Sequence, residues 1–338
     1  MAGDLHHGRL HPAPAPAGAG RDLVERTCPP GRRGGRPVMK PVTVVVNGGA
    51  GTGHDEAACD RLRALLHGTG LDAELVLADG GERMIASARR ALGQGARLVA
   101  AGGGDGTINA VASVMVDSGV PFGVLPLGTL NHFAKDLGIP LDLDAAVRNL
   151  ATGRPQRVDV GEVNGRIFLN NSSLGLYPDI VHDREQQQRR LGRGKWPAAA
   201  WAALAALRRY PFLSMRLDVN GERLARRTPF VFIGNNAYTM QGLSIGERAR
   251  LDEGVLSLYV AQHPTRLGLL RFAFDALRGR LGDEPDFDIL QAPGFDIGTP
   301  HKRLRVATDG EVTVMSPPLR YRMRPGALTV LVPSSTIP

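Results

Sequence analysis

The sequence predicts an α/β domain built on a parallel, doubly wound sheet, followed by a β-rich domain that folds as a sandwich. Two observations predict this fold class. Between residues 41 and 152, short apolar runs alternate with amphipathic runs of helical length, as in repeated β-α units around a parallel sheet. From Gln156 onward, strand-like runs follow one another, and several are joined by turn pairs such as Asn164-Gly165 and Asn220-Gly221. A chain of 338 residues is long enough for about two domains.

Residues 1–40 precede the first predicted strand. Pro, Ala, Gly and Arg dominate this stretch, which contains HPAPAPAGAG and PPGRRGGRP and hardly any bulky apolar residue. Such a composition buries too little apolar surface to offset the loss of chain entropy, so we expect a disordered extension. The α/β domain then covers residues 41–152, and the β-rich domain covers residues 153–333.

Each element follows from its own pattern. Val42–Val46 is a continuous β-branched run, typical of a strand buried on both faces. Gly153-Arg154-Pro155 ends the last helix of the first domain, because proline removes a backbone donor. The other helices and strands of this domain are expected at Asp55–Leu66, Asp72–Leu77, Gly81–Leu92, Leu98–Ala101, Ile108–Val116, Phe122–Leu125 and Leu141–Thr152. Strands of the second domain are expected within Arg157–Val163, Arg166–Leu174, Leu213–Glu222, Thr228–Asn235, Val255–Ala261 and Leu304–Val314.

The stretch Leu98–Asn109, LVAAGGGDGTIN, runs from a strand through three glycines into a helix. Glycine lets the backbone approach a phosphate closely, and the free N–H groups at a helix start favour an anion. Asp105 stands among these groups and would repel a phosphate unless a cation lay between them, so the arrangement indicates a Mg²⁺-nucleotide site. The spacing is not that of a Walker loop. The alternative is an ordinary glycine-rich βα turn.

A second loop follows the next predicted strand, in FGVLPLGTLNHFAKDLGIP (Phe122–Pro140). Adjacent loops at the carboxyl edge of an open α/β sheet are where such folds bind ligands. The pair GGGDGTIN and LPLGTLNHFAKDLGIP resembles the diacylglycerol kinase catalytic domain family, which includes bacterial soluble lipid kinases and the sphingosine and ceramide kinases. The two motifs together are specific, whereas GGDGT alone also occurs in NAD kinases and, more loosely, in phosphofructokinases.

The resemblance covers about Pro41–Pro333. It implies a first domain folded like those of phosphofructokinase and NAD kinase, and a final strand, Gly326–Pro333, that returns to this domain. The loop after the first strand keeps Asn47 and Gly51 of the family's N-P-x-S/A-G pattern, and His132 stands where the family more often has Asp. The residues placed at the nucleotide are Asn47, Gly103, Gly104, Asp105, Gly106, Thr107, Asn109 and Thr129.

The catalytic carboxylates are expected in a D-G-E turn, Asp309-Gly310-Glu311. By itself such a turn is most simply a solvated hairpin. The resemblance implies that it closes the site, with Glu311 as the proton acceptor that activates a lipid hydroxyl. Asp309 would orient Glu311 or help to hold the catalytic metal, and the two roles are interchangeable at this level. Asp105 completes the catalytic set by reaching Mg²⁺, directly or through water.

A second metal site is implied by ARLDEGV (Ala249–Val255), which resembles the D-G-x-L segment that holds a structural Mg²⁺ in bacterial members of the family. Carried over, Glu253 supplies the carboxylate, and Arg250 and Val255 supply main-chain carbonyls. Glu replaces the usual Asp and is one methylene longer, so Asp252 is an alternative. A plain β-turn without metal is the other interpretation.

The net charge of +8 and the isoelectric point near 10.0 favour acidic partners. The basic tail has no interleaved aromatic residues, which argues against nucleic acid. Within Asp183–Phe212, basic residues flank a Trp-bearing apolar helix suited to an anionic membrane interface, although a helix packed on the sandwich is the alternative. Arg189, Arg190, Arg193 and Lys195 precede this helix, and Arg208 and Arg209 follow it. With no signal-like segment and no run long enough to span a bilayer, we expect a cytoplasmic, peripherally membrane-associated protein.

These observations predict an ATP-dependent lipid kinase of phospholipid metabolism that acts on a lipid hydroxyl, most simply that of diacylglycerol. Its cofactor is Mg²⁺, and its partners are ATP, the lipid and the membrane surface, with a homodimer as a further state. The alternatives are an NAD kinase, disfavoured by PLGTLNHFA, and a catalytically silent nucleotide- or lipid-binding regulator, disfavoured by the joint presence of Asp105, Asp309 and Glu311.

Overall fold

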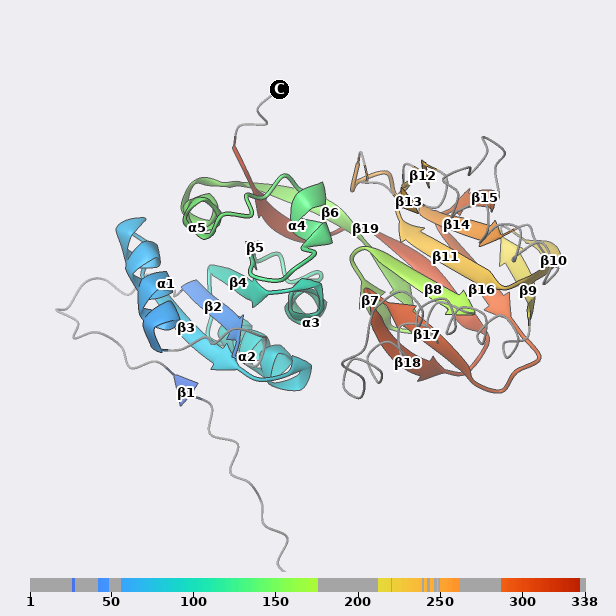
Figure 1. Ribbon diagram of the computed structural model, residues 1–338, viewed down its shortest axis with the longest axis horizontal. Helices are drawn as coiled ribbons and strands as arrows, with labels where there is room; N and C mark the ends of the chain where they lie inside the picture. Colours follow the sequence, from blue (N-terminus) through green and yellow to red (C-terminus); the bar gives the residue numbers. More distant parts are fainter. Residues whose placement is uncertain are drawn as a thin grey trace, which may run out of the picture.

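The computed structural model describes residues 26–27, 42–48, 56–175, 212–219, 221–238, 240–241, 244–245, 248, 250–261 and 287–334. Figure 1 shows two bodies side by side, one with helices around a sheet and one made of strands. Two long strands run from one body into the other.

The first body has a sheet of four parallel strands, each a short and strongly apolar run. They are β2 (Val42–Asn47), β3 (Ala73–Ala78), β4 (Leu98–Gly103) and β5 (Phe122–Pro126), in the order β3-β2-β4-β5. Every residue of β4 and β5 is buried. Strands covered on both faces need apolar side chains on both, which explains why these runs do not alternate.

Helices cover both faces of this sheet. On one face α1 (Glu56–Gly68) and α5 (Leu143–Thr152) pack together, and on the other α2 (Gly81–Gly93) packs against α3 (Asp105–Met115). Each pair has its own buried apolar cluster against the strands. The short helix α4 (His132–Asp136) follows β5 and adds Phe133 to the α2–α3 side. The sheet is therefore doubly wound.

The two long strands β6 (Arg154–Val163) and β19 (Leu319–Val332) pair antiparallel along their length, with a register shift between Arg324 and Leu328. Near its end β19 also pairs in parallel with β5, through Val330 and Phe122. Nearer its start it pairs with β16 (Gly294–Gly298) of the second body. One continuous sheet thus joins the two bodies (Figure 1).

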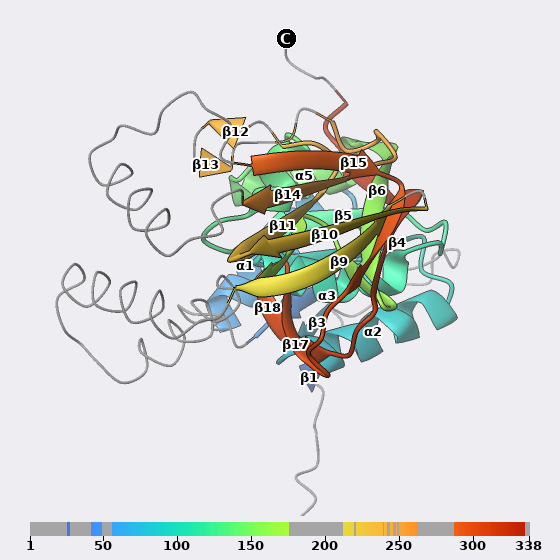
Figure 2. The ribbon, with the colours of Figure 1, turned by 90° about the vertical axis from the view of Figure 1, so that its right-hand side faces the viewer.

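The second body is a sandwich of two antiparallel sheets. One sheet continues from β19 through β16 to β9 (Leu213–Val219) and β10 (Glu222–Thr228), as seen from the sandwich end in Figure 2. Its partner sheet has the order β15-β14-β11-β8-β17-β18. These strands are β15 (Phe287–Ala292), β14 (Leu256–Ala261), β11 (Phe230–Asn235), β8 (Asn171–Gly175), β17 (Leu304–Thr308) and β18 (Glu311–Met315). A third apolar cluster fills the space between the sheets. The predicted fold class is confirmed.

Three short strands complete the described elements. β7 (Arg166–Phe168) forms a hairpin with β6, and β12 (Met240–Gln241) pairs with β13 (Ser244–Ile245). β1 (Arg26–Thr27) pairs antiparallel with β3, inside the stretch for which the sequence predicts disorder. The outer edge of β3 offers unpaired backbone groups, and two residues of extended chain satisfy part of that edge.

Some predicted features fall outside the described residues. These are the remainder of the 1–40 extension, the loop after Asn47 that contains Gly51, and residues 183–211 with Arg189, Arg190, Arg193 and Lys195. Among the residues that the structure does describe, no helix has the length and apolar character needed to cross a bilayer.

Candidate active site

Loops from three parallel strands meet at the carboxyl edge of the first sheet. β2 ends at Asn47, whose side-chain amide donates to the hydroxyl of Thr107 in α3 (3.2 Å). The loops after β4 and β5 touch each other through their backbones, since a Cβ on Gly128 would stand 2.4 Å from the Cα of Gly104. Only glycine permits that approach. The two loops that the sequence singled out therefore form one surface.

Asn131 gives the second loop its shape. Its backbone is left-handed, with φ of 50°, a conformation that asparagine tolerates better than most residues. Its side-chain amide donates to the carbonyl of Gly128 (2.8 Å), and its Oδ1 accepts from the N–H of the same residue (3.1 Å). This closed turn leads into α4, where the N–H of Phe133 donates to Oδ1 of Asp105 (3.4 Å). Asp105, in the first turn of α3, thus lies next to the start of α4.

The D-G-E turn joins β17 to β18 and reaches the glycine loop from the second body. Asp309 and Gly310 both have positive φ, 47° and 85°, as a tight hairpin requires. A Cβ on Gly106 would stand 3.4 Å from Oε1 of Glu311. The carboxylate of Glu311 therefore lies against the GGGDGT loop, although the two segments belong to different bodies.

The carboxylate of Asp309 points the other way. It accepts three backbone hydrogen bonds, from the N–H groups of Leu169 (2.7 Å), Asn170 (2.8 Å) and Asn171 (3.0 Å). Burial raises the pKa of Asp309 to about 6, although these hydrogen bonds and the charge of Arg248 act to lower it. With its acceptors occupied by backbone, Asp309 anchors the turn that carries Glu311.

Arg166 is a site residue that the sequence did not reveal. It stands at the start of β7, donating to Oγ1 of Thr308 (2.9 Å) and to Oε2 of Glu311 (2.5 Å). Both groups of this ion pair are partly exposed. Nothing in its neighbourhood along the chain, an Asn-Gly turn, distinguishes Arg166 from any solvated arginine.

A buried ion pair joins the two bodies beside the site. Nε and one terminal nitrogen of Arg248 donate to Oδ2 of Asp136, the last residue of α4 (2.8 and 2.7 Å). The side chain of Arg248 is 0% exposed, and that of Asp136 is 7% exposed. The ring of Tyr238 lies 5.3 Å from the guanidinium carbon.

The other donors of Arg248 are also satisfied. They reach the carbonyls of Leu169 (2.7 Å) and Asn235 (3.0 Å) and Oδ1 of Asn170 (2.9 Å). Leu169 and Asn170 are two of the residues whose N–H groups hold Asp309. One guanidinium thus connects α4, which touches Asp105, to the loop that anchors the D-G-E turn. The sequence carries no signal for this, because the partners lie far apart along the chain.

The remaining nucleotide candidates differ in exposure. Gly103 is fully packed, since a Cβ there would stand 2.5 Å from the side chain of Thr107. Thr107 and Asn109 are both buried in α3, and Oδ1 of Asn109 has no hydrogen-bond partner among the described residues. Thr129 is exposed next to Gly128, and His132 is exposed at the start of α4. The structure therefore groups all these positions at one edge, with Asn109 facing inward.

The predicted metal turn lies on the sandwich. The N–H of Ala237 donates to Oε2 of Glu253 (3.3 Å), and the carbonyl of Val255 accepts from the N–H of Asn236 (3.0 Å). Arg250 is exposed and pairs with Asp252 (3.0 Å). No cluster of three or more His, Cys, Asp or Glu side chains that could hold a metal occurs in the described ranges. In this turn Glu253 and Asp252 are the carboxylates, so an ion there would take its other ligands from main-chain carbonyls and water.

Known sequence families cover nearly all of the chain past residue 40. The diacylglycerol kinase catalytic domain matches residues 41–163. The YegS C-terminal NAD kinase beta sandwich-like domain matches residues 179–332. A crystal structure described as a diacylglycerol kinase from Bacillus anthracis strain Sterne superimposes with a TM-score of 0.66, at 19% identity over 89% of this chain and 100% of that one. At that identity the superposition shows the fold alone.

Two curated relatives show the family of the chain more closely. A protein named probable lipid kinase YegS-like from Chromohalobacter salexigens is 30% identical over 257 residues, 74% of this chain and 80% of that protein. Its namesake from Pseudomonas aeruginosa strain PAO1 is 32% identical over 269 residues, 76% of this chain and 83% of that protein. The fold and the matches define a two-domain protein with a diacylglycerol kinase catalytic domain and a β-sandwich. Within that class, the chain belongs to the YegS-like lipid kinase family, which confirms the resemblance.

Proposed function

We propose that the protein transfers the γ-phosphoryl group of Mg-ATP to the hydroxyl group of a lipid, with diacylglycerol as the simplest acceptor. The observation that carries this proposal is the contact between the D-G-E turn and the glycine loop, where Glu311 Oε1 lies 3.4 Å from the position of a Cβ on Gly106. A carboxylate next to a phosphate-type loop is what the transfer to an alcohol needs. Family membership supports the reaction class, because the relatives are named as lipid kinases.

Glu311 is the proposed general base. A lipid hydroxyl is a poor nucleophile until a positioned carboxylate takes its proton. Glu311 is exposed on the side of the glycine loop, so a hydroxyl can reach it. Arg166 holds one of its oxygens, and Asp309 fixes the turn through three backbone N–H groups. These contacts support Glu311 as the base and Asp309 as the residue that orients it.

Asp105 is the proposed contact for the catalytic cation. Its carboxylate is partly exposed at the edge where the glycine loops meet, and a carboxylate oxygen is a ligand that Mg²⁺ prefers. When bound, Mg²⁺ would neutralise phosphate charge during the transfer. The backbone of Gly103, Gly104 and Gly106 would lie along the phosphates. The hydrogen bond from Asn47 to Thr107 keeps the end of β2 next to the start of α3, directly after the glycine loop.

The sandwich turn is the proposed site of a structural Mg²⁺, held by Glu253 and the carbonyls of Arg250 and Val255. The side chain of Asn236 adds support, because it is 0% exposed and neither its oxygen nor its nitrogen has a hydrogen-bond partner in the described part of the chain. The backbone N–H of Asn236 donates to the carbonyl of Val255, so Asn236 lies next to the predicted metal turn. An oxygen-only set with few protein ligands suits Mg²⁺, which keeps several waters.

The place of action follows from the substrate. A lipid acceptor sits in a bilayer, so the protein would work in the cytoplasm at the surface of an anionic membrane, with the basic segment around Arg189 and Lys195 as the electrostatic contact. A homodimer is compatible with this arrangement. Nucleic acid is not a partner in this proposal.

The test is incubation of the purified protein with labelled ATP, Mg²⁺ and separate micelles of diacylglycerol, a sphingoid base and ceramide, with NAD as a further acceptor. We expect label in one lipid phosphate. Label in NAD would mean that the protein is an NAD kinase. Nucleotide binding with no transfer to any acceptor would mean that it is a silent binding protein.

A further inference from the structure

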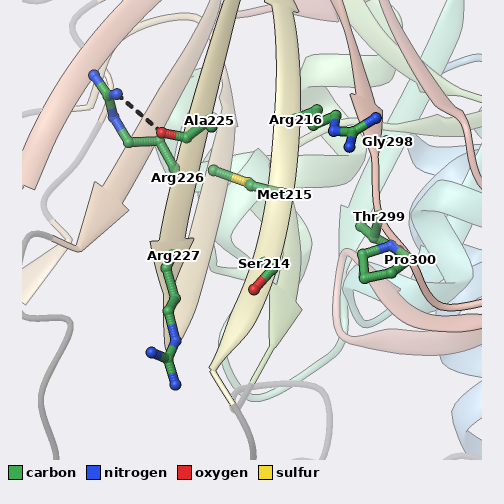
Figure 3. Close-up of a pocket in the computed structure, with 9 residues that line it drawn as sticks. All are labelled: Ser214, Met215, Arg216, Ala225, Arg226, Arg227, Gly298, Thr299 and Pro300. Atoms are coloured by element: carbon green, nitrogen blue, oxygen red, sulfur yellow. Dashed lines mark hydrogen bonds between the residues drawn. The ribbon is translucent and has the colours of Figure 1, made fainter.

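The sandwich carries a cavity of about 570 Å³ on strands that take no part in the site described above. It lies over β9, β10 and β16, at the end of the molecule remote from the glycine loops (Figures 1 and 2). Figure 3 shows its lining, which includes three arginines and several small or hydroxyl-bearing residues. The lining residues are Ser214, Met215, Arg216, Ala225, Arg226, Arg227, Gly298, Thr299 and Pro300.

Strand register explains the hollow. Arg216 in β9 stands between Ala225 in β10 and Gly298 in β16, in one row across the sheet. Ser214 in β9 is directly opposite Arg227 in the next row. Residues in register share a face, and here this face is the one turned away from the core, since Ser214, Arg216, Ala225 and Arg227 are exposed. Small side chains beside two long arginines leave a depression with a basic rim.

Arg216 and Arg227 differ from the neighbouring arginines in their charge pairing. The nearby Arg223, Arg226 and Arg322 have acidic partners in Asp218 (3.5 Å), Asp288 (3.5 Å) and Asp296 (2.7 Å). Within the described ranges, by contrast, no carboxylate lies within 4.0 Å of a guanidinium nitrogen of Arg216 or Arg227. Arg227 has its guanidinium carbon 5.3 Å from the ring centre of Phe212 instead, a contact that leaves its N–H groups free for an anion.

We propose that this hollow is an accessory binding site for a phosphate group. The planar guanidinium fork matches the oxygens of a phosphate, and the hydroxyl of Ser214, directly opposite Arg227, supplies a further donor on that side of the hollow (Figure 3). The site is separate from catalysis, because its residues lie on β9, β10 and β16 and at the two positions after β16, and in the described part of the chain no hydrogen bond or ion pair joins them to Asp105 or Glu311. The phosphate has two possible sources, a free anion or the headgroup of an anionic phospholipid.

The test compares two double variants that lose the same charge. Arg216→Gln with Arg227→Gln removes the basic rim, whereas Arg89→Gln with Arg97→Gln removes two exposed arginines of the first body. Saturating Mg-ADP occupies the glycine loops, and calorimetry then measures the Kd of inorganic phosphate and of short-chain, water-soluble phosphatidic acid. Flotation with phosphatidylcholine vesicles, with and without phosphatidic acid, measures binding to a lipid surface.

We expect the rim variant to lose at least about tenfold in affinity, as for removal of charge-assisted hydrogen bonds, while the control variant binds as the parent does. The rim variant should phosphorylate a micellar lipid at the same rate as the parent. If the rim variant binds both soluble ligands more weakly, the site takes free anions. If it binds only the vesicles more weakly, the site takes lipid headgroups. Equal binding by the rim variant, the control and the parent in every arm would overturn the proposal, whether or not the protein proves to be a lipid kinase.

Discussion

Asp309 and Glu311 stand two positions apart in one turn, yet their carboxylates have opposite surroundings. The carboxylate of Asp309 faces three backbone N–H groups, whereas that of Glu311 is exposed beside the glycine loop and held by Arg166. The sequence left the two roles interchangeable. This difference supports our proposal that Glu311 takes the proton of the substrate and that Asp309 orients Glu311.

Glu311→Gln should therefore slow lipid phosphorylation by roughly 10² to 10⁴, the usual contribution of a general base, because the amide keeps the shape but takes no proton. Nucleotide affinity should barely change, since in our proposal the glycine backbone and Mg²⁺ hold the phosphates. Single-turnover rates and nucleotide titrations measure the two quantities. If the variant loses nucleotide affinity and keeps the chemical step, Glu311 holds the metal and another group is the base.

Asp105→Asn should abolish phosphoryl transfer while leaving the fold intact. The neutral amide keeps an acceptor for the N–H of Phe133 but loses the charge that attracts a divalent cation. Turnover over a range of Mg²⁺ concentrations, with circular dichroism as the check on folding, tests this. A well-folded variant with normal turnover would remove Asp105 from the mechanism.

The raised pKa of Asp309, about 6 against an ordinary value of 3.8, makes stability depend on pH. The folded protein holds this proton more tightly than the unfolded chain does. The stabilisation is therefore complete below pH 3.8 and is lost as pH rises through about 6. Urea unfolding over this window should show the parent losing stability relative to Asp309→Asn as pH increases. A constant difference between the two proteins would mean that Asp309 does not titrate there.

Site residues that belong to a short sequence motif could be predicted from the sequence. Site residues whose partners are distant in the sequence could not. Asp105, Asn47 and the D-G-E turn sit in short patterns whose residue types have a chemical reason to be together. Arg166 and Arg248 are single arginines in a basic chain, and their partners are distant in sequence. Only the paired strands bring them to the site.

At the scale of elements, the buried pair of Arg248 with Asp136 of α4 links the two bodies in addition to the shared sheet. Arg248→Ala should cost about 3–5 kcal/mol of unfolding free energy, because it leaves the Asp136 charge buried without a partner. Arg250→Ala is the matched control, since its pair with Asp252 is exposed and screened by water, so its loss should change stability little. Chemical denaturation measures both. Equal effects would mean that the buried pair stabilises no more than the surface pair.

Helices and strands of the first body could be predicted from sequence because periodicity and turn residues are local signals. The expected Phe122–Leu125 strand and Leu141–Thr152 helix appear as β5 and α5 with shifts of one or two residues. α3 begins at Asp105 rather than at Ile108, because the DGT residues form its first turn. The length of the β6–β19 ribbon could not be predicted from these local signals, since pairing between distant strands depends on the whole sheet.

At the scale of the molecule, we expect the shared ribbon of β6 and β19 to make the two bodies unfold as one cooperative unit. Leu328 in β19 is 0% exposed, so Leu328→Ala should cost about 2–5 kcal/mol and lower amide protection in β5 and β16 together. Val314→Ala, at a side chain 56% exposed, should leave protection nearly unchanged. Hydrogen exchange resolved by strand makes the comparison. Loss of protection on one side only would show that the bodies open independently.

The pairing of β19 with β5 also bears on the order in which a ribosome makes the chain. Domains usually fold as they emerge, the N-terminal one first. Here the strand that lies beside β5 comes from residues 328–332, which are synthesised after the entire sandwich. Until then β5 has an open edge, the kind of surface that recruits other chains. The body that begins to form first is therefore the one that must wait for the end of translation to be complete.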